Sequence, residues 1–223
     1  MSLTFREPEQ TTLPPNAPRR RTRILGAVLG WAGVAVCALF ALFAVYAAGL
    51  ELLVLLGVAA PDGRVMPPLF VAHALTGAVA LTAGAVQLKL AHRWSRTRPR
   101  VHRVLGRTYV VTATFTAAGG LLIAAFFDVG WPAKVAFAAW SLGWAAATLH
   151  ATRHAIARRF DRHRAWMMRS YALALVFVTF SFGKDALAAT GAPRTTVYVG
   201  ALVIAGALNL TITELWIRRR RPC

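Results

Sequence analysis

The 223-residue chain is 57% hydrophobic and only 15% charged, with a mean hydropathy of +0.52 and a formal net charge of +18. A soluble domain is usually nearer half apolar, with about a quarter of its residues charged, so this composition excludes an ordinary soluble domain. Two classes of protein remain for so basic a chain, one that binds nucleic acid and one that lies in a membrane with basic loops.

Six apolar stretches follow a polar, proline-rich segment at 1–23, which we expect to be a disordered basic tail rather than a secretory signal. A bilayer core of about 30 Å is crossed by about 20 apolar residues of helix. The expected helices are 24–50, 67–88, 101–127, 131–152, 163–189 and 197–217, with a basic end at 218–223. Backbone groups in lipid must bond internally, so the predicted fold class is all-α, a polytopic integral membrane protein with a bundle of six transmembrane helices.

The basic residues lie on alternate sides of these helices. If the tail is cytoplasmic, the tail, the 89–107 and 153–169 regions and the C-terminus hold 22 of the 26 lysines and arginines. This asymmetry follows the positive-inside rule and predicts a bacterial cytoplasmic membrane protein with both termini inside. The basic segments contact the membrane surface and lack interleaved stacking aromatics, so we expect anionic lipid head groups as partners and no nucleic acid.

The second helix carries a narrow stripe that is small in its middle and polar at both ends. At about 100° per residue, one face collects five positions, namely His73, Gly77, Ala80, Gly84 and Gln87. Small residues allow close contact between helices, and the polar ends can bond across it. The same pattern also suits a groove for a ligand or cofactor, and the intramembrane, ionisable His73 is a candidate contact in it.

The histidines separate by depth. His73 is predicted near the outer surface, about 20 Å from the others along the membrane normal, whereas His102 and His163 begin the third and fifth helices at the inner surface. His102 and His163 are therefore candidates for contacts with haem b or another ligand, with His150 and His154 nearby on the fourth helix. Neither the spacing of His150 and His154 nor the two cysteines predicts a metal site.

The two basic loops resemble each other, as a duplicated hairpin would. Each places a His-Arg pair at a helix start, then an arginine inside the helix and a tyrosine two residues later: first His102, Arg103, Arg107 and Tyr109, then His163, Arg164, Arg169 and Tyr171. Cations at a helix N-terminus are unfavourable, so an anion between the two starts would be stabilising. The alternative is a general effect of anionic lipid.

The sixth helix carries Asn209 and Glu214. Glu214 precedes Arg218 by four residues, the spacing of an ordinary helical ion pair. It is also the only carboxylate within an apolar helix near the inner face, where Arg107 and Arg169 are expected. We therefore predict that Glu214 pairs inward with Arg169 or Arg107, while an Arg169 that reaches to the surface is the alternative.

Four segments, AHALTGAVALTAGAVQL, VHRVLGRTYVV, HRAWMMRSYALAL and NLTITELWIRR, resemble the bacterial membrane-protein family catalogued as domain of unknown function 2306. The resemblance covers about residues 68–220. Its pattern matches His73, Gly77, Gln87, His102, Arg103, Gly106, Arg107, Tyr109, His163, Arg164, Trp166, Met167, Arg169, Tyr171, Asn209 and Glu214. His150 and His154 do not match it, so the resemblance points to His102 and His163 and supports the topology without implying an activity.

Three function classes remain open from these residues. One is a membrane electron-transfer protein with haem b or a quinone near His102 and His163. Another is a permease for a small molecule or ion that uses the stripe and the Arg–Glu pair. The third is an accessory membrane subunit.

Overall fold

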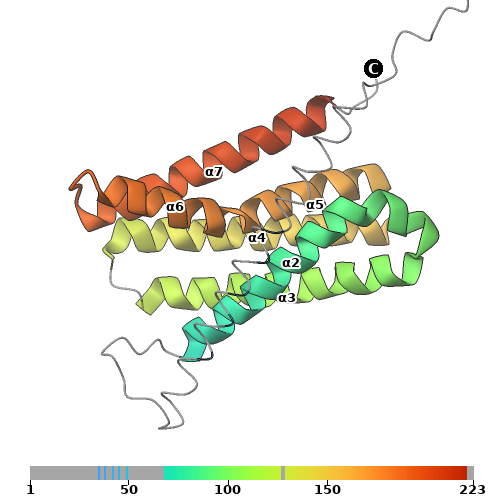
Figure 1. Cartoon of the computed structure of the whole chain (residues 1–223), viewed down its shortest axis with the longest axis horizontal. Coiled ribbons are helices and arrows are strands. Elements are labelled where there is room, and N and C mark those ends of the chain that lie inside the picture. Colours follow the sequence, from blue (N-terminus) through green and yellow to red (C-terminus); the bar gives the residue numbers. More distant parts are fainter. Residues whose placement is uncertain are drawn as a thin grey trace, which may run out of the picture.

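The computed structural model describes residues 68–126 and 129–219, together with the isolated positions 35, 38, 42, 45 and 49. These residues form helices and contain no β-strand (Figure 1). The elements are α2 (Pro68–Thr97), α3 (Pro99–Phe126), α4 (Trp131–Ile156), α5 (Phe160–Ala174), α6 (Val176–Ala188) and α7 (Arg194–Arg219). The predicted tail and most of the predicted helix 24–50 lie outside the described residues, although its five isolated positions are helical.

Four stretches are long and apolar enough to cross a membrane: Pro68–Ala91, Pro99–Phe126, Phe160–Ala188 and Arg194–Arg219. The helix α4 is of similar length but is not among them, because its tryptophans and its basic C-terminal end lower its hydropathy. The described part of the chain is therefore an all-helical bundle with several membrane-spanning candidates.

Helix α2 continues to Thr97, past the end of the predicted stretch at residue 88. Only Arg98 separates it from α3, so most of the region expected as a loop is helical. The prediction followed the end of the apolar run. A helix needs apolar residues only while it is in lipid, and the lysine, arginine and alanine residues beyond that point are good helix formers.

The stretch predicted as one helix over 163–189 is interrupted at Leu175, where α5 ends and α6 begins. The carbonyl of Leu175 accepts from the amides of both Val178 and Thr179, each at 3.0 Å, and from the Thr179 hydroxyl at 3.2 Å. Side chains of two other helices also donate hydrogen bonds to backbone carbonyls just before the break. Trp140 Nε1 of α4 donates to Leu173 at 3.2 Å, and Asn209 Nδ2 of α7 donates to Ala172 at 3.3 Å. Such side-chain bonds stabilise an irregular helix in lipid.

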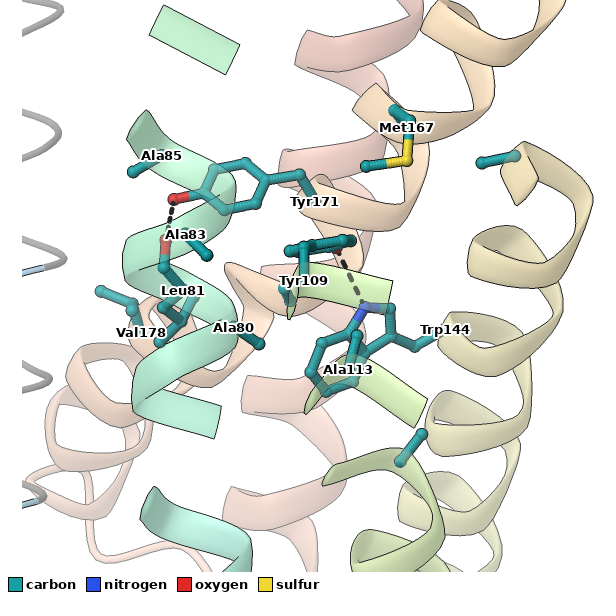
Figure 2. Packing of buried hydrophobic residues seen from close by; sticks show 13 residues of the cluster. Ala80, Leu81, Ala83, Ala85, Tyr109, Ala113, Trp144, Met167, Tyr171 and Val178 are labelled. Atoms are coloured by element: carbon teal, nitrogen blue, oxygen red, sulfur yellow. Dashed lines mark hydrogen bonds between the residues drawn. The ribbon is translucent and has the colours of Figure 1, made fainter. Parts of the chain in front are cut away.

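The helices pack mainly as chain neighbours, with α2 along α3, α3 along α4, α4 along α5 and α6 along α7. In Figure 1, α2 crosses α3 obliquely and α7 lies beyond α6. The largest group of buried residues is rich in alanine and centres on Tyr109, Tyr171 and Trp144 (Figure 2). Small side chains let these helices approach closely, so packing contacts and interhelical hydrogen bonds hold the bundle together.

Candidate functional site

The C-terminal half of α2 holds a buried polar contact with the start of α3. The side-chain nitrogen Nε2 of Gln87 donates to Nδ1 of His102 at 2.9 Å and to the His102 backbone carbonyl at 2.9 Å. A Cβ added at Gly106 would lie 3.3 Å from that nitrogen, so a glycine there accommodates the amide. The carbonyl fixes the orientation of the amide, because only its NH₂ group can donate.

The other atom of this amide lacks a partner. Gln87 is only 6% exposed, and its Oε1 is buried without a hydrogen-bond partner among the described residues. A buried acceptor without a partner lowers the stability of the folded protein by about 1–3 kcal/mol unless another group donates a hydrogen bond to it. The position of Oε1 beside His102 therefore suits a molecule that carries a hydrogen-bond donor.

His163 lies close enough to His102 for their imidazoles to interact electrostatically. Its Nδ1 donates to the carbonyl of Ala151 at 2.9 Å. In the neutral ring, this bond leaves Nε2 of His163 as an acceptor. The starts of α3 and α5 thus carry two histidines with opposite roles, since His102 presents a donor at Nε2.

This hydrogen bonding does not fit a haem held between His102 and His163. Nδ1 of His102 accepts from Gln87, so the proton of the neutral ring is on Nε2, the atom that would have to bind iron. Reversing the amide would place its oxygen against the carbonyl of His102. Among the described residues, no three His, Cys, Asp or Glu side chains gather in a way that could hold a metal ion.

His150 and His154, near the C-terminal end of α4, belong to the basic surface. His150 stacks on Trp166, with ring centroids 4.9 Å apart. The pKa of His154 is lowered from its ordinary value of 6.5 by burial and by the positive charges of Arg162 and Arg159. Positive charges therefore gather around this end of α4.

Glu214 of α7 pairs with Arg169 of α5. The guanidinium Nε donates to Oε1, and Nη2 donates to Oε2 at 3.1 Å, so the contact is bidentate. The Arg169 side chain is 21% exposed and that of Glu214 is 34% exposed. The guanidinium carbon also lies 4.9 Å from the centre of the Trp166 ring. Of the two arginines that the sequence offered to Glu214, the structure brings Arg169 to it.

The other predicted cationic residues do not join this pair. Arg103, Arg107 and Arg164 are all exposed on the outside of the bundle. The group proposed from the sequence as an ion pair or anion site therefore separates into an internal pair on α5 and α7 and an outward-facing set on α3 and α5.

The stripe on α2 is mainly a packing surface. A Cβ added at Gly77 would lie 3.3 Å from Thr116 on α3, and one at Gly84 would lie 2.5 Å from the Tyr171 ring and 2.9 Å from the Tyr109 ring. The two rings contact each other with centroids 6.4 Å apart, and Tyr171 donates to the Leu81 carbonyl at 3.1 Å (Figure 2). Asn209 lies apart from the stripe, at the α5–α6 break.

A buried chain of hydroxyls, which the sequence interpretation missed, connects α3, α4 and α5. Thr148 Oγ1 donates to the Trp144 carbonyl at 2.9 Å, which leaves its oxygen to accept from Ser170 at 2.7 Å. Ser170 then accepts from Tyr109 at 2.8 Å, and Tyr109 accepts from Trp144 Nε1 at 3.4 Å. Serine and threonine in apolar helices often bond only to their own helix, so their spacing gave no signal.

We predict that Tyr109→Phe lowers the free energy of unfolding by about 1–3 kcal/mol, because it leaves the Trp144 N–H without its acceptor and Ser170 without its donor. Unfolding by SDS in mixed micelles measures this change. Tyr171→Phe is the matched control and should cost less, since the hydroxyl that it loses donates to a helix carbonyl. Equal losses would contradict the assigned hydroxyl chain.

A second feature lies toward the other end of α2, around His73. Its Nδ1 donates to the Thr116 carbonyl at 2.9 Å. His73 lines a cavity of about 50 Å³ together with Gly77, Leu81, Thr116, Trp144, Ala174 and Phe177, among others. A buried water needs about 10–15 Å³ by this measure, so the cavity has the volume for a few waters, although its lining is mostly apolar. It adjoins the α5–α6 break and is distant from Gln87 and His102.

Comparison with known proteins gives one match. The family model described as "Predicted membrane protein (DUF2306)" matches residues 70–217, which cover α3 to α6 completely and most of α2 and α7. No curated protein and no solved structure matches the chain.

Proposed function

The chain belongs to the DUF2306 family of predicted membrane proteins. We propose that it binds a membrane-soluble ligand at its inner end, and that the polar head of this ligand carries a hydroxyl hydrogen. The site comprises Gln87, His102 and His163. A quinol is the ligand class that best suits both the site and its place in a bilayer. The single observation that carries this proposal is the buried, unpartnered Oε1 of Gln87.

We further propose that the protein has six spans in a bacterial cytoplasmic membrane, with both termini in the cytoplasm. The four candidate spans, α4 and the apolar stretch 24–50 together supply six segments. The asymmetry of lysine and arginine supports the orientation. In this topology the end of α2 and the starts of α3 and α5 face the cytoplasmic leaflet, so the ligand head binds near the inner head-group level.

The chemistry of the site favours a ligand whose head donates a hydrogen bond over one that only accepts hydrogen bonds or carries a negative charge. Gln87 Oε1 and Nε2 of a neutral His163 accept hydrogens, while Nε2–H of His102 donates one. A hydroxyl both donates and accepts, so a quinol head suits this set. A quinone, carboxylate or phosphate group offers acceptors only and would face Oε1 without a hydrogen between them.

We predict that purified protein in nanodiscs binds a short-chain quinol about tenfold more tightly than the matching quinone, a difference of about 1.4 kcal/mol. Quenching of tryptophan fluorescence under anaerobic conditions measures both affinities. Gln87→Leu removes the acceptor and should abolish the preference, whereas Asn209→Leu, which removes an amide at the α5–α6 break, should keep it.

Two outcomes would overturn the proposal. One is equal affinity for quinol and quinone in the unaltered protein, and the other is a preference that survives in Gln87→Leu. An absorbance spectrum of the purified protein is recorded first. A Soret band with near-stoichiometric haem that is lost in His102→Ala would show that Nε2 of His102 binds iron and that its proton is on Nδ1, against the assignment made above.

A further inference from the structure

The outward face of α3 changes from basic to apolar along its length. At about 100° per residue, its exposed side chains fall on one side of the helix, in the order Arg100, Arg103, Val104, Arg107, Val111, Phe115 and Leu122. The three arginines occupy the end nearest the α2–α3 connection, and the apolar residues continue toward the other surface. This order matches the profile of one membrane leaflet, in which head groups give way to acyl chains.

Arg107 is an exposed cation, yet it lies well inside α3 from the N-terminal end of the helix. It is about 7.5 Å further along the axis than His102 and about 10 Å further than Arg100, at about 1.5 Å per residue. It belongs to the candidate span Pro99–Phe126. Among the described residues, the ion pairs are Arg169–Glu214 and Lys184–Asp185, so neither Arg103 nor Arg107 pairs with a described carboxylate. A charged side chain at such a depth is costly unless an anion or the interface solvates it.

We propose that Arg103 and Arg107 bind the phosphate of an anionic phospholipid in the inner leaflet, with its acyl chains along Val111, Phe115 and Leu122. Arg103 and Arg107 are four residues apart, so their side chains project from neighbouring turns of one face. Guanidinium groups bind phosphate oxygens through two parallel hydrogen bonds, which suits a phosphate shared between two arginines. This proposal rests on the surface of α3 and not on the Gln87 site.

The apolar part of the face distinguishes a lipid from a free phosphate ion. Inorganic phosphate has no group to cover Val111, Phe115 or Leu122, all of which are more than half exposed. A phospholipid binds both parts at once. Weak attraction of anionic lipid to the whole basic surface is the other possibility, and it depends on total charge rather than on these two positions.

The test measures retained lipid by native mass spectrometry, after extraction from membranes with equal amounts of phosphatidylglycerol and phosphatidylcholine. The unaltered protein should retain phosphatidylglycerol at least fivefold over phosphatidylcholine. Arg103→Gln with Arg107→Gln should reduce this ratio to about one. The matched control, Arg158→Gln with Arg162→Gln, removes the same charge from exposed positions in and just after the α4–α5 connection and should keep the preference.

Equal losses in the two double variants would show a bulk charge effect and overturn the proposal. Displacement of the lipid by millimolar inorganic phosphate would overturn the lipid assignment, because acyl contacts would then contribute nothing. Each variant must keep the thermal unfolding midpoint of the unaltered protein. Should Arg107→Gln fail to fold, Arg107→Lys replaces it, and the loss of bidentate binding should still reduce the ratio at least twofold.

Discussion

Replacing Arg169 or Glu214 with alanine should each lower the free energy of unfolding by about 1–3 kcal/mol, less than the ~3–5 kcal/mol typical of a fully buried pair, because both side chains are partly exposed. The two side chains form a bidentate contact between α5 and α7 and are largely shielded. Removal of either partner takes away the two charge-assisted hydrogen bonds that the other makes between α5 and α7. Steric trapping in bicelles measures the free energy without detergent denaturation.

The double variant separates a specific pair from two independent effects. If the pair accounts for the loss, Arg169→Ala with Glu214→Ala should be little worse than either single variant. If Arg169 only reaches for the membrane surface, the losses should add. Arg169→Met with Glu214→Leu should recover most of the stability, since apolar replacement of a whole buried pair is often neutral or favourable.

A second ion pair provides the control. Lys184 and Asp185 are sequence neighbours on α6, and the Asp185 side chain is 76% exposed. Alanine at Lys184 should cost less than about 1 kcal/mol, as is usual for an exposed pair. A comparable loss at both pairs would show that the interhelical position of Arg169 adds nothing.

Gly84→Ala should destabilise the protein by about 1–3 kcal/mol, the usual cost of overpacking a filled core. The added Cβ would lie 2.5 Å from two atoms of the Tyr171 ring and 2.9 Å from the Tyr109 ring. Neither ring can withdraw easily. Tyr109 is fully buried and bonded to Ser170, and the Tyr171 hydroxyl is bonded to Leu81 (Figure 2). Thermal unfolding midpoints in one detergent measure the change.

Gly143→Ala is the matched control, because nothing lies within 4 Å of a Cβ at this exposed position in α4. It should leave stability unchanged or raise it by up to about 1 kcal/mol, since alanine favours helix over glycine. Tyr171→Leu should also be less harmful in the Gly84→Ala background than alone, because it removes the clash. Equal effects at Gly84 and Gly143 would contradict the close packing of α2 on the tyrosines.

The structure contains some of the contacts predicted for the site residues and several features that the sequence did not predict. Gln87 and His73 were expected to bond across a helix contact, and both do so with α3. Tyr109 and Tyr171 hold corresponding positions in the two similar basic loops, and their ring centroids lie 6.4 Å apart, a contact that the similarity did not predict. The break at Leu175, the hydroxyl chain through Ser170 and the orphan oxygen of Gln87 had no counterpart in the sequence pattern. Each depends on how side chains of different helices meet.

The sequence by itself determined that this protein lies in a membrane, that it is helical and that one part of its surface is basic. Those properties are local, since apolar length and the need to bond the backbone within lipid act on each segment separately. Only the tertiary structure decided that Glu214 meets Arg169, that Arg107 faces outward and that Gln87 keeps one acceptor without a donor. These outcomes depend on how each helix is rotated and crossed against its neighbours. That arrangement results from many small packing contacts, which no single segment contains.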